Sequence, residues 1–215
     1  MPISWDEKPV RFCGELCIDE LTTLHCTALR DTKFSVELGK LQERNLSWVR
    51  RNPKVFMMIM DPLFGRGAIG YSAMLPLTTK GIDIYLDGAL KDPDIPAYLV
   101  APEENSTAAV LLFAIYLRQD YSFVIAKSPR EYTIFFLKQI CFHVKAMHPD
   151  DRKYPPIYVQ SELPSLVRRL RKQGFKGTGR LSADGLELLV LQCPSESELL
   201  SRLSSVLRRR VSTIA

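Results

Sequence analysis

The sequence contains no glycine between Ala89 and Gln173, although 11 glycines occur among its 215 residues. Loops that wrap their backbone around a phosphate group commonly use glycine, because it has no Cβ and adopts positive φ angles readily. The central stretch therefore lacks a glycine-rich phosphate loop. An anion site in this stretch would depend on side chains and on the free amides at a helix start.

Long apolar runs are also absent. The longest, residues 108–117, is about half of what spans a bilayer, so we expect no transmembrane helix. The first ten residues include acidic side chains and no apolar segment, which argues against a secretory signal. The five cysteines are odd in number and irregularly spaced. We therefore expect free thiols in a reducing compartment, the cytoplasm.

Positive charge is unevenly distributed. Residues 164–215 hold ten Lys and Arg against four Asp and Glu, a net charge of +6, whereas residues 1–163 have a net charge of −1. This pattern argues against a nucleic-acid groove through the whole domain. An amphipathic helix is expected at 195–210, and it ends in three arginines. Three interpretations stay open for it: a protein-partner site, an attraction to an acidic surface, or a helix docked on its own domain.

Apolar periodicity and turn residues predict alternating helices and strands. Asn52-Pro53 is expected to end a helix, because the residue before proline avoids the helical region. Ser128-Pro129 is typical of a helix start. The helices are expected at 19–29, 36–51, 128–147, 163–173 and 195–210. The strands are expected at 55–60, 68–77, 82–90, 108–117, 157–159, 176–181 and 186–192.

Four residues near the N-terminus are of types that bind zinc: Cys13, Cys17, His25 and Cys26. Their spacing lacks the two-residue separation of zinc-binding cysteine pairs, and no second pair lies at a usual distance. Small buried thiols are the favoured interpretation, so no metal is expected.

Three short motifs, in this order, resemble the GCN5-related N-acetyltransferases. A helix ending in Asn52-Pro53 precedes a strand with Gly70-Tyr71, and the helix Leu170–Gly174 runs into Phe175 before a last strand. The resemblance covers about residues 10–193, so we expect one domain at 1–193 and an appended basic helix at 194–215. It implies a single α/β domain, with a mixed, mostly antiparallel sheet, a splayed central strand pair and helices on both faces.

The resemblance also implies a function, the transfer of an acyl group, most simply acetyl, from acyl-CoA to a small-molecule or peptide amine. Acyl-CoA is then a co-substrate, and no metal is needed. The residues expected around its pyrophosphate are Leu117, Arg118, Gln119, Lys127, Ser128 and Arg130. Glu104 is the candidate base for the amine, and Tyr116 or Tyr158 the candidate acid for the thiolate. Each of these residues also has a simpler interpretation, as a solvated charge, a helix cap or a packed ring.

Two departures from the family pattern keep a second function open. Leu170 stands where the family often has a tyrosine that protonates the leaving thiolate, and leucine has no such proton. The segment 117–128 has no glycine. The alternative is a catalytically degenerate binding or regulatory module of the same fold, which acts through its cleft or through the basic C-terminal helix.

Overall fold

A computed structural model provides the fold. It describes residues 10–29, 37–61, 67–103, 107–118, 129–148, 154–192, 194–195, 197–199 and 201. The strands are β1 (Val10–Phe12), β2 (Phe56–Met60), β3 (Ala68–Leu77), β4 (Ala109–Leu117), β5 (Ile157–Val159), β6 (Lys176–Leu181) and β7 (Glu187–Leu191). The α-helices are α1 (Ile18–Leu29), α2 (Leu38–Arg51), α3 (Thr79–Leu86), α5 (Pro129–Met147) and α6 (Pro164–Lys172), with short 3₁₀ turns η2 (Glu15–Cys17), η3 (Asp92–Asp94) and η4 (Ala97–Leu99).

The strands form one seven-stranded sheet in the order β1-β2-β3-β4-β5-β7-β6. Among the strand pairs described, β4 and β5 run parallel and the others run antiparallel. This confirms the predicted mixed, mostly antiparallel sheet. It also places the one parallel pair at the centre, where a long connection through α5 joins the two strands.

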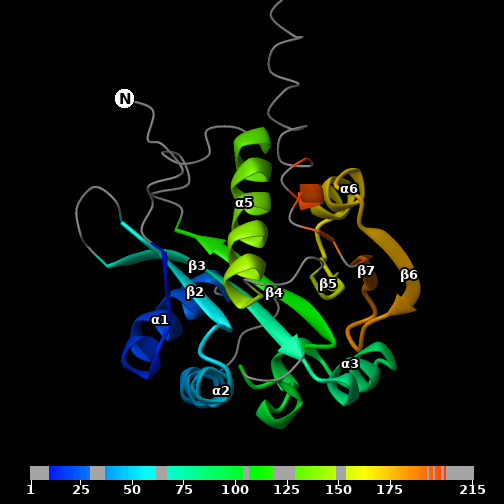
Figure 1. The fold of residues 1–215 in the computed structure, drawn as a ribbon. Helices are drawn as coiled ribbons and strands as arrows, with labels where there is room; N and C mark the ends of the chain where they lie inside the picture. Colours follow the sequence, from blue (N-terminus) through cyan, green and yellow to red (C-terminus); the bar gives the residue numbers. More distant parts are fainter. Residues whose placement is uncertain are drawn as a thin grey trace, which may run out of the picture.

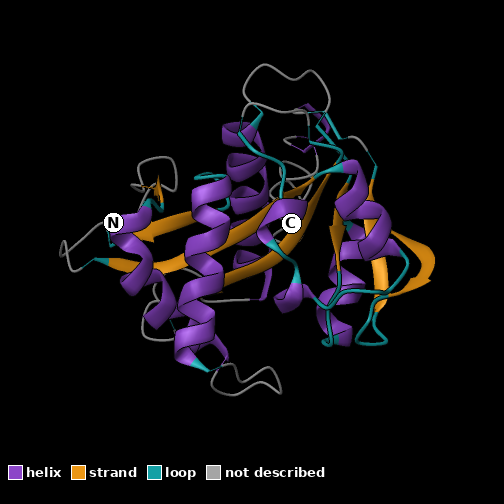
Figure 2. Cartoon of the chain, turned by 90° about the horizontal axis from the view of Figure 1, so that it is seen from below, coloured by secondary structure: helices purple, strands orange, loops and turns teal. Residues whose placement is uncertain are grey.

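Helices cover both faces of the sheet, as predicted. One apolar cluster joins the sheet to α1, α2 and α3, and a second joins it to α5 and α6. Figure 1 shows α1, α2 and α3 below the sheet and α5 above it. Figure 2 shows the helices lying across the strands in the view from below. We call these two sides the α1–α2 face and the α5–α6 face.

The prediction of a strand at 82–90 is wrong, because most of this segment belongs to helix α3. The Thr78 side chain caps the helix by accepting a hydrogen bond from the Gly81 amide at 3.0 Å. Ile82 and Tyr85 are buried three residues apart, which matches a helix turn and not a strand. The cap and this spacing were present in the sequence, and the apolar content of the segment obscured them.

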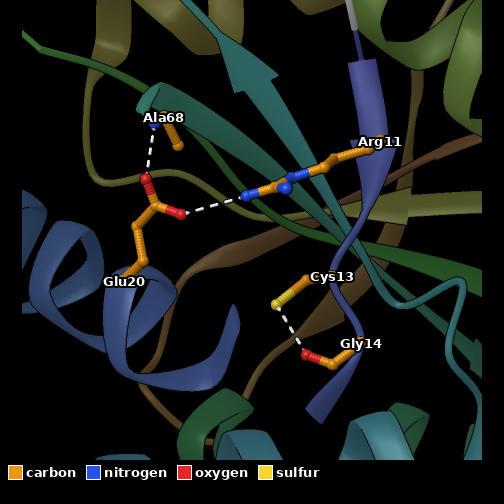
Figure 3. Close-up of polar contacts among 5 residues, drawn as sticks. All are labelled: Arg11, Cys13, Gly14, Glu20 and Ala68. Carbon is orange, nitrogen blue, oxygen red and sulfur yellow. Dashed lines mark hydrogen bonds and ion pairs between the residues drawn. The ribbon is translucent and has the colours of Figure 1, made fainter. Parts of the chain in front are cut away.

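Glu20 links α1 to the sheet through hydrogen bonds. Its Oε1 accepts from the Ala68 amide at 2.6 Å and its Oε2 from Arg11 at 3.2 Å, so one carboxylate joins α1 to β3 and β1 (Figure 3). Gly67 makes the close approach possible, since a Cβ there would lie 2.5 Å from Glu20 Oε1. The position of α1 over the sheet is therefore set by a polar contact as well as by packing.

His143 fastens α5 to the other face. Its Nε2 lies 2.6 Å from the Lys54 carbonyl oxygen and its Nδ1 lies 2.8 Å from Ser72 Oγ. A carbonyl only accepts, so Nε2 carries the proton and Nδ1 accepts from the serine. Burial lowers the pKa of His143 to about 4, and the hydrogen bond to the Lys54 carbonyl opposes that shift. The histidine is thus a neutral link from α5 to β3 and to the turn that precedes β2.

The predicted C-terminal helix begins at the expected place. Ser195 Oγ accepts from the Glu198 amide at 3.2 Å, while Glu198 Oε2 accepts from the Ser195 amide at 2.7 Å. This reciprocal pair is a capping box. Leu199 is buried in the cluster of the α5–α6 face, and the three terminal arginines lie outside the described residues. In the described part of the chain, no helix has both the length and the apolar character that a bilayer crossing requires.

Candidate functional site

The parallel pair at the centre of the sheet separates early. β4 and β5 are in register at only two positions, Val110 with Ile157 and Leu111 with Tyr158. β4 continues to Leu117 beyond that point. No strand in the described part of the chain pairs with β4 on this side after Leu111. We call residues 112–117 the open edge of β4.

A β-bulge marks the start of the open edge. On the β3 side, Ala73 lies opposite Ala114 and Met74 lies opposite Leu112, so Phe113 is an extra residue in β4. A bulge bends the strand and increases its twist, which redirects β4 away from β5. The separation of the two strands therefore has a local cause in β4 itself.

The open edge has backbone amides that point away from β3. The Arg118 amide donates to Ile69 on β3 at 2.9 Å. Successive strand residues point alternately to the two sides, so the amides of Leu117 and Ile115 point away from β3, toward the open side. Residues 113–116 are half-buried, whereas the first four residues of β4 are buried. An extended ligand could pair with this edge as a strand would.

The residues predicted around a pyrophosphate are only partly described. Leu117 is buried against Ile69 and Phe135 on the α5–α6 face. Arg118 is half-buried directly after β4, and Arg130 belongs to the first turn of α5. The structure thus places Leu117 and Arg118 together at the end of the open edge. Gln119, Lys127 and Ser128 lie outside the described residues, so the proposed pyrophosphate site stays a prediction.

Tyr116 and Tyr158, the two predicted acids, share one side of the sheet. Both are half-buried and pack against the cluster of the α1–α2 face, on the two strands that separate. The Tyr116 ring lies 5.9 Å from that of Tyr71. Glu104, the predicted base, lies outside the described residues. Leu170 is buried in the opposite cluster, with Phe175, so it has a packing role on the far face.

Sequence reasoning missed Arg44, which reaches the bulge from α2. Its guanidinium carbon lies 4.7 Å from the Trp48 ring centre and 5.3 Å from that of Phe113. Nη2 donates to Asn45 Oδ1 at 3.2 Å, while Nε is buried without a hydrogen-bond partner among the described residues. Burial lowers the pKa of Arg44 to about 10, which nearby Tyr71, Asp94 and Asp92 oppose. The side chain remains a cation at neutral pH.

An acidic group lies within electrostatic range of Arg44. Asp92 accepts from the Tyr85 hydroxyl at 2.6 Å and bonds to the Gln160 side chain. Burial raises the pKa of Asp92, and these two hydrogen bonds oppose the shift. Asp184 Oδ1 lies 3.4 Å from Lys91 Nζ. Gln160 Oε1 and Asp184 Oδ2 are buried acceptors with no partner among the described residues.

These residues come from four separate parts of the chain. α2 supplies Arg44, η3 supplies Asp92, the residue after β5 is Gln160, and the turn between β6 and β7 supplies Asp184. The spacing of Arg44 and Trp48 on one helix was a signal for a stacked pair. Nothing in the sequence linked Arg44 to Asp92, Gln160 or Asp184, because these residues lie far apart along the chain. We call the four residues the polar cluster.

The thiols and histidines near the N-terminus do not form a metal centre in the described residues, where no three His, Cys, Asp or Glu side chains are placed to hold an ion. Cys13 is buried, and burial with the neighbouring Cys17 raises the pKa of its thiol to about 12. Its Sγ donates to the Gly14 carbonyl at 3.5 Å (Figure 3). This is the environment of a packed, unreactive thiol.

Comparison with solved structures places the fold among the N-acetyltransferases. An N-acetyltransferase from Staphylococcus aureus is 10% identical with a TM-score of 0.51, over 87% of this chain and 99% of its own. A chimeric spermidine N-acetyltransferase from Vibrio cholerae and hSSAT is 12% identical with a TM-score of 0.52, over 90% and 98%. A proposed acetyltransferase from Salmonella typhimurium, solved with its cofactor acetyl-CoA, is 12% identical with a TM-score of 0.50, over 88% and 95%.

No protein-family model matches the sequence, and no curated protein matches it. The likeness is therefore one of structure, and it spans nearly the full length of these acetyltransferases. It confirms the resemblance first seen in the order of the motifs: the chain has the fold of the GCN5-related N-acetyltransferases, at low sequence identity.

Proposed function

We propose that the protein is an acyl-CoA-dependent N-acyltransferase that transfers an acyl group, most simply acetyl, to an amine. The observation that supports this most directly is the open edge of β4, since its pairing with β5 ends at Leu111 and Tyr158 while β4 runs on to Leu117. A sheet normally satisfies its central backbone groups with a neighbouring strand. A gap in the middle of a sheet is therefore a place for a ligand with amides of its own.

Acyl-CoA fits this edge chemically. Its pantetheine arm carries two amides, and the amides of Ile115 and Leu117 can pair with such groups as in a β-ladder. Its pyrophosphate would then meet Arg118 and the start of α5, where free backbone amides favour an anion. The predicted contacts of Gln119, Lys127, Ser128 and Arg130 belong to this same region.

The reaction needs two proton transfers. The amine nitrogen, once neutral, attacks the thioester carbonyl carbon, a C–N bond forms and the C–S bond breaks. The amine loses its proton to a base, for which Glu104 is the candidate. The leaving thiolate takes a proton from an acid, for which Tyr116 and Tyr158 are the candidates, because both lie beside the separated strands on one face.

Calorimetric titration of acetyl-CoA into the full chain tests the proposal. Saturable binding is expected, together with CoA release when amines are supplied, followed by chromatography. The absence of binding at millimolar acetyl-CoA would exclude the function. Binding without turnover of any amine would instead favour the alternative, a non-catalytic module of this fold.

A matched pair of variants tests the role of the open edge. Ile115→Pro removes an amide that points away from β3, so the β3–β4 ladder keeps its hydrogen bonds. The expected result is about a 10-fold loss of acetyl-CoA affinity or more, from one lost hydrogen bond. Ile115→Val keeps the amide and should bind like the unmodified chain. Equal affinity of the two variants would remove the open edge from the binding site.

Cellular location and protein partners stay predictions. The cytoplasm and a partner-binding role for residues 195–210 were expected from cysteine usage and from charge. A division of the chain at 193/194 is likewise a proposal, and the burial of Leu199 shows that the second segment begins in contact with the main core.

A further inference from the structure

Arg44 is a half-buried cation with no carboxylate bonded to it in the described part of the chain. Its guanidinium stacks over Trp48 and Phe113, and this attraction offsets part of the free energy that burying the charge costs. Buried charges are normally paired as well, because removing an ion from water costs several kcal/mol. The unpartnered Nε therefore calls for an anion that the described residues do not supply.

Two aspartates near Arg44 do not serve as that anion. Asp92 is engaged by the Tyr85 hydroxyl and the Gln160 side chain, and Asp94 is exposed. Both act on Arg44 through space and neither has an ion pair with it among the described residues. Their charge lowers the cost of keeping Arg44 ionised but leaves Nε without a hydrogen-bond partner among the described residues.

The position of Arg44 indicates what the anion belongs to. Phe113, under the guanidinium, is the bulge residue at the start of the open edge of β4. Tyr116 and Tyr158 lie on the same face of the sheet as Phe113. Arg44 is thus next to the place where an amine would meet the thioester, and not at the α5 end, where the pyrophosphate is expected.

We propose that Arg44 binds a carboxylate of the acceptor, so that the acceptor is an amine that also carries a carboxylate, as amino acids and peptides do. This rests on the proposed N-acyltransferase function. Arginine suits the role because its planar guanidinium can donate two parallel hydrogen bonds to the two oxygens of a carboxylate. The unpartnered acceptors Gln160 Oε1 and Asp184 Oδ2 belong to the polar cluster, which Asp92 links to Arg44 electrostatically.

The test uses product-like probes and does not need CoA. The N-acetyl derivatives of the twenty standard amino acids are each compared with the corresponding N-acetyl amino acid amide, by thermal shift and calorimetry on the full chain. At least one carboxylate is expected to bind about 10-fold or more tightly than its amide, the effect of one charged hydrogen-bonded contact. Equal binding of both series, or binding of neither, overturns the proposal.

Three variants locate the effect. Arg44→Met keeps a flexible, polarizable side chain over the two rings but removes the charge, and it should abolish the preference for the carboxylate. Arg44→Lys should restore only part of it, because an ammonium lacks the fork. Arg50→Met is the matched control, since Arg50 lies on the same helix, exposed and paired with Glu15. An Arg44→Met protein that is folded and still prefers the carboxylate would assign the anion site elsewhere.

The outcome is separable from that of the proposed function. Carboxylate binding that depends on Arg44, without any acetyl-CoA binding, would support the anion site and reject the acyltransferase. Acetyl transfer to amines with no preference for a carboxylate would support the acyltransferase and reject the anion site.

Discussion

Two buried polar side chains, His143 and Arg44, lie on opposite faces of the sheet in different surroundings. On the α5–α6 face, both ring nitrogens of His143 have partners and the ring is neutral. On the α1–α2 face, Arg44 is charged, and its Nε is buried without a hydrogen-bond partner in the described residues. A satisfied network stabilises a fold, whereas an unsatisfied one costs stability and persists where a ligand completes it. The comparison assigns a structural role to His143 and a binding role to Arg44.

The largest effect is expected from His143→Ala. It leaves the Lys54 carbonyl and Ser72 hydroxyl buried without partners and opens a cavity under α5, so the free energy of unfolding should fall by about 3 kcal/mol. Urea denaturation followed by circular dichroism measures this. Ser72→Ala should cost about 1 kcal/mol, and the double variant less than the sum of the two. A loss below about 1 kcal/mol for His143→Ala would contradict a structural role.

Acid should weaken the fold through the same histidine. Burial lowers the pKa of His143 to about 4, whereas an unfolded histidine titrates near 6.5. The unfolded chain therefore binds more protons in that window, and the free energy of unfolding falls as pH drops from about 6.5 to 4, by about 3 kcal/mol. Stability is at its full value above pH 6.5 as far as His143 is concerned.

Two other groups change the dependence of stability on pH. His25 has a pKa lowered to about 3 by burial and by Arg44, so it adds to the acid loss. Asp92 opposes it, because its raised pKa makes the folded chain hold a proton that the unfolded chain has released. His143→Gln removes the contribution of His143 and keeps those of His25 and Asp92. The urea midpoint of this variant should therefore fall less steeply from pH 7 to 4 than that of the unmodified chain. Identical slopes would show that His143 is not the titrating group.

A smaller loss is expected from Tyr85→Phe on the α1–α2 face. The variant removes the hydroxyl that donates to Asp92 at 2.6 Å, and about 1 kcal/mol of unfolding free energy should be lost. The pKa of Asp92 should rise further, since one hydrogen bond to its ionised form is gone. NMR titration of Asp92 checks the pKa, and Tyr98→Phe, at an exposed tyrosine, is the control.

Periodicity and chain order predicted most of the sheet and the two helices that end at Asn52 and begin at Pro129. They failed at 82–90, where the apolar content suggested a strand although the spacing of Ile82 and Tyr85 and the Thr78 cap indicate a helix. The bulge at Phe113 was not predictable, because a bulge depends on the partner strand. The polar cluster was not predictable either, since its members are local to no single segment and meet only across the sheet.

The smallest change in stability is expected from Arg44→Met, and it sharpens the comparison most. Removing a buried cation without a bonded carboxylate takes away a desolvation cost, while methionine keeps the contacts with Trp48 and Phe113. The free energy of unfolding should change by less than about 1 kcal/mol, in either direction. A loss as large as that of His143→Ala would show that Arg44 is structural after all. A stable variant that has lost carboxylate binding would show that the α1–α2 face gives up stability for a ligand, as binding sites do.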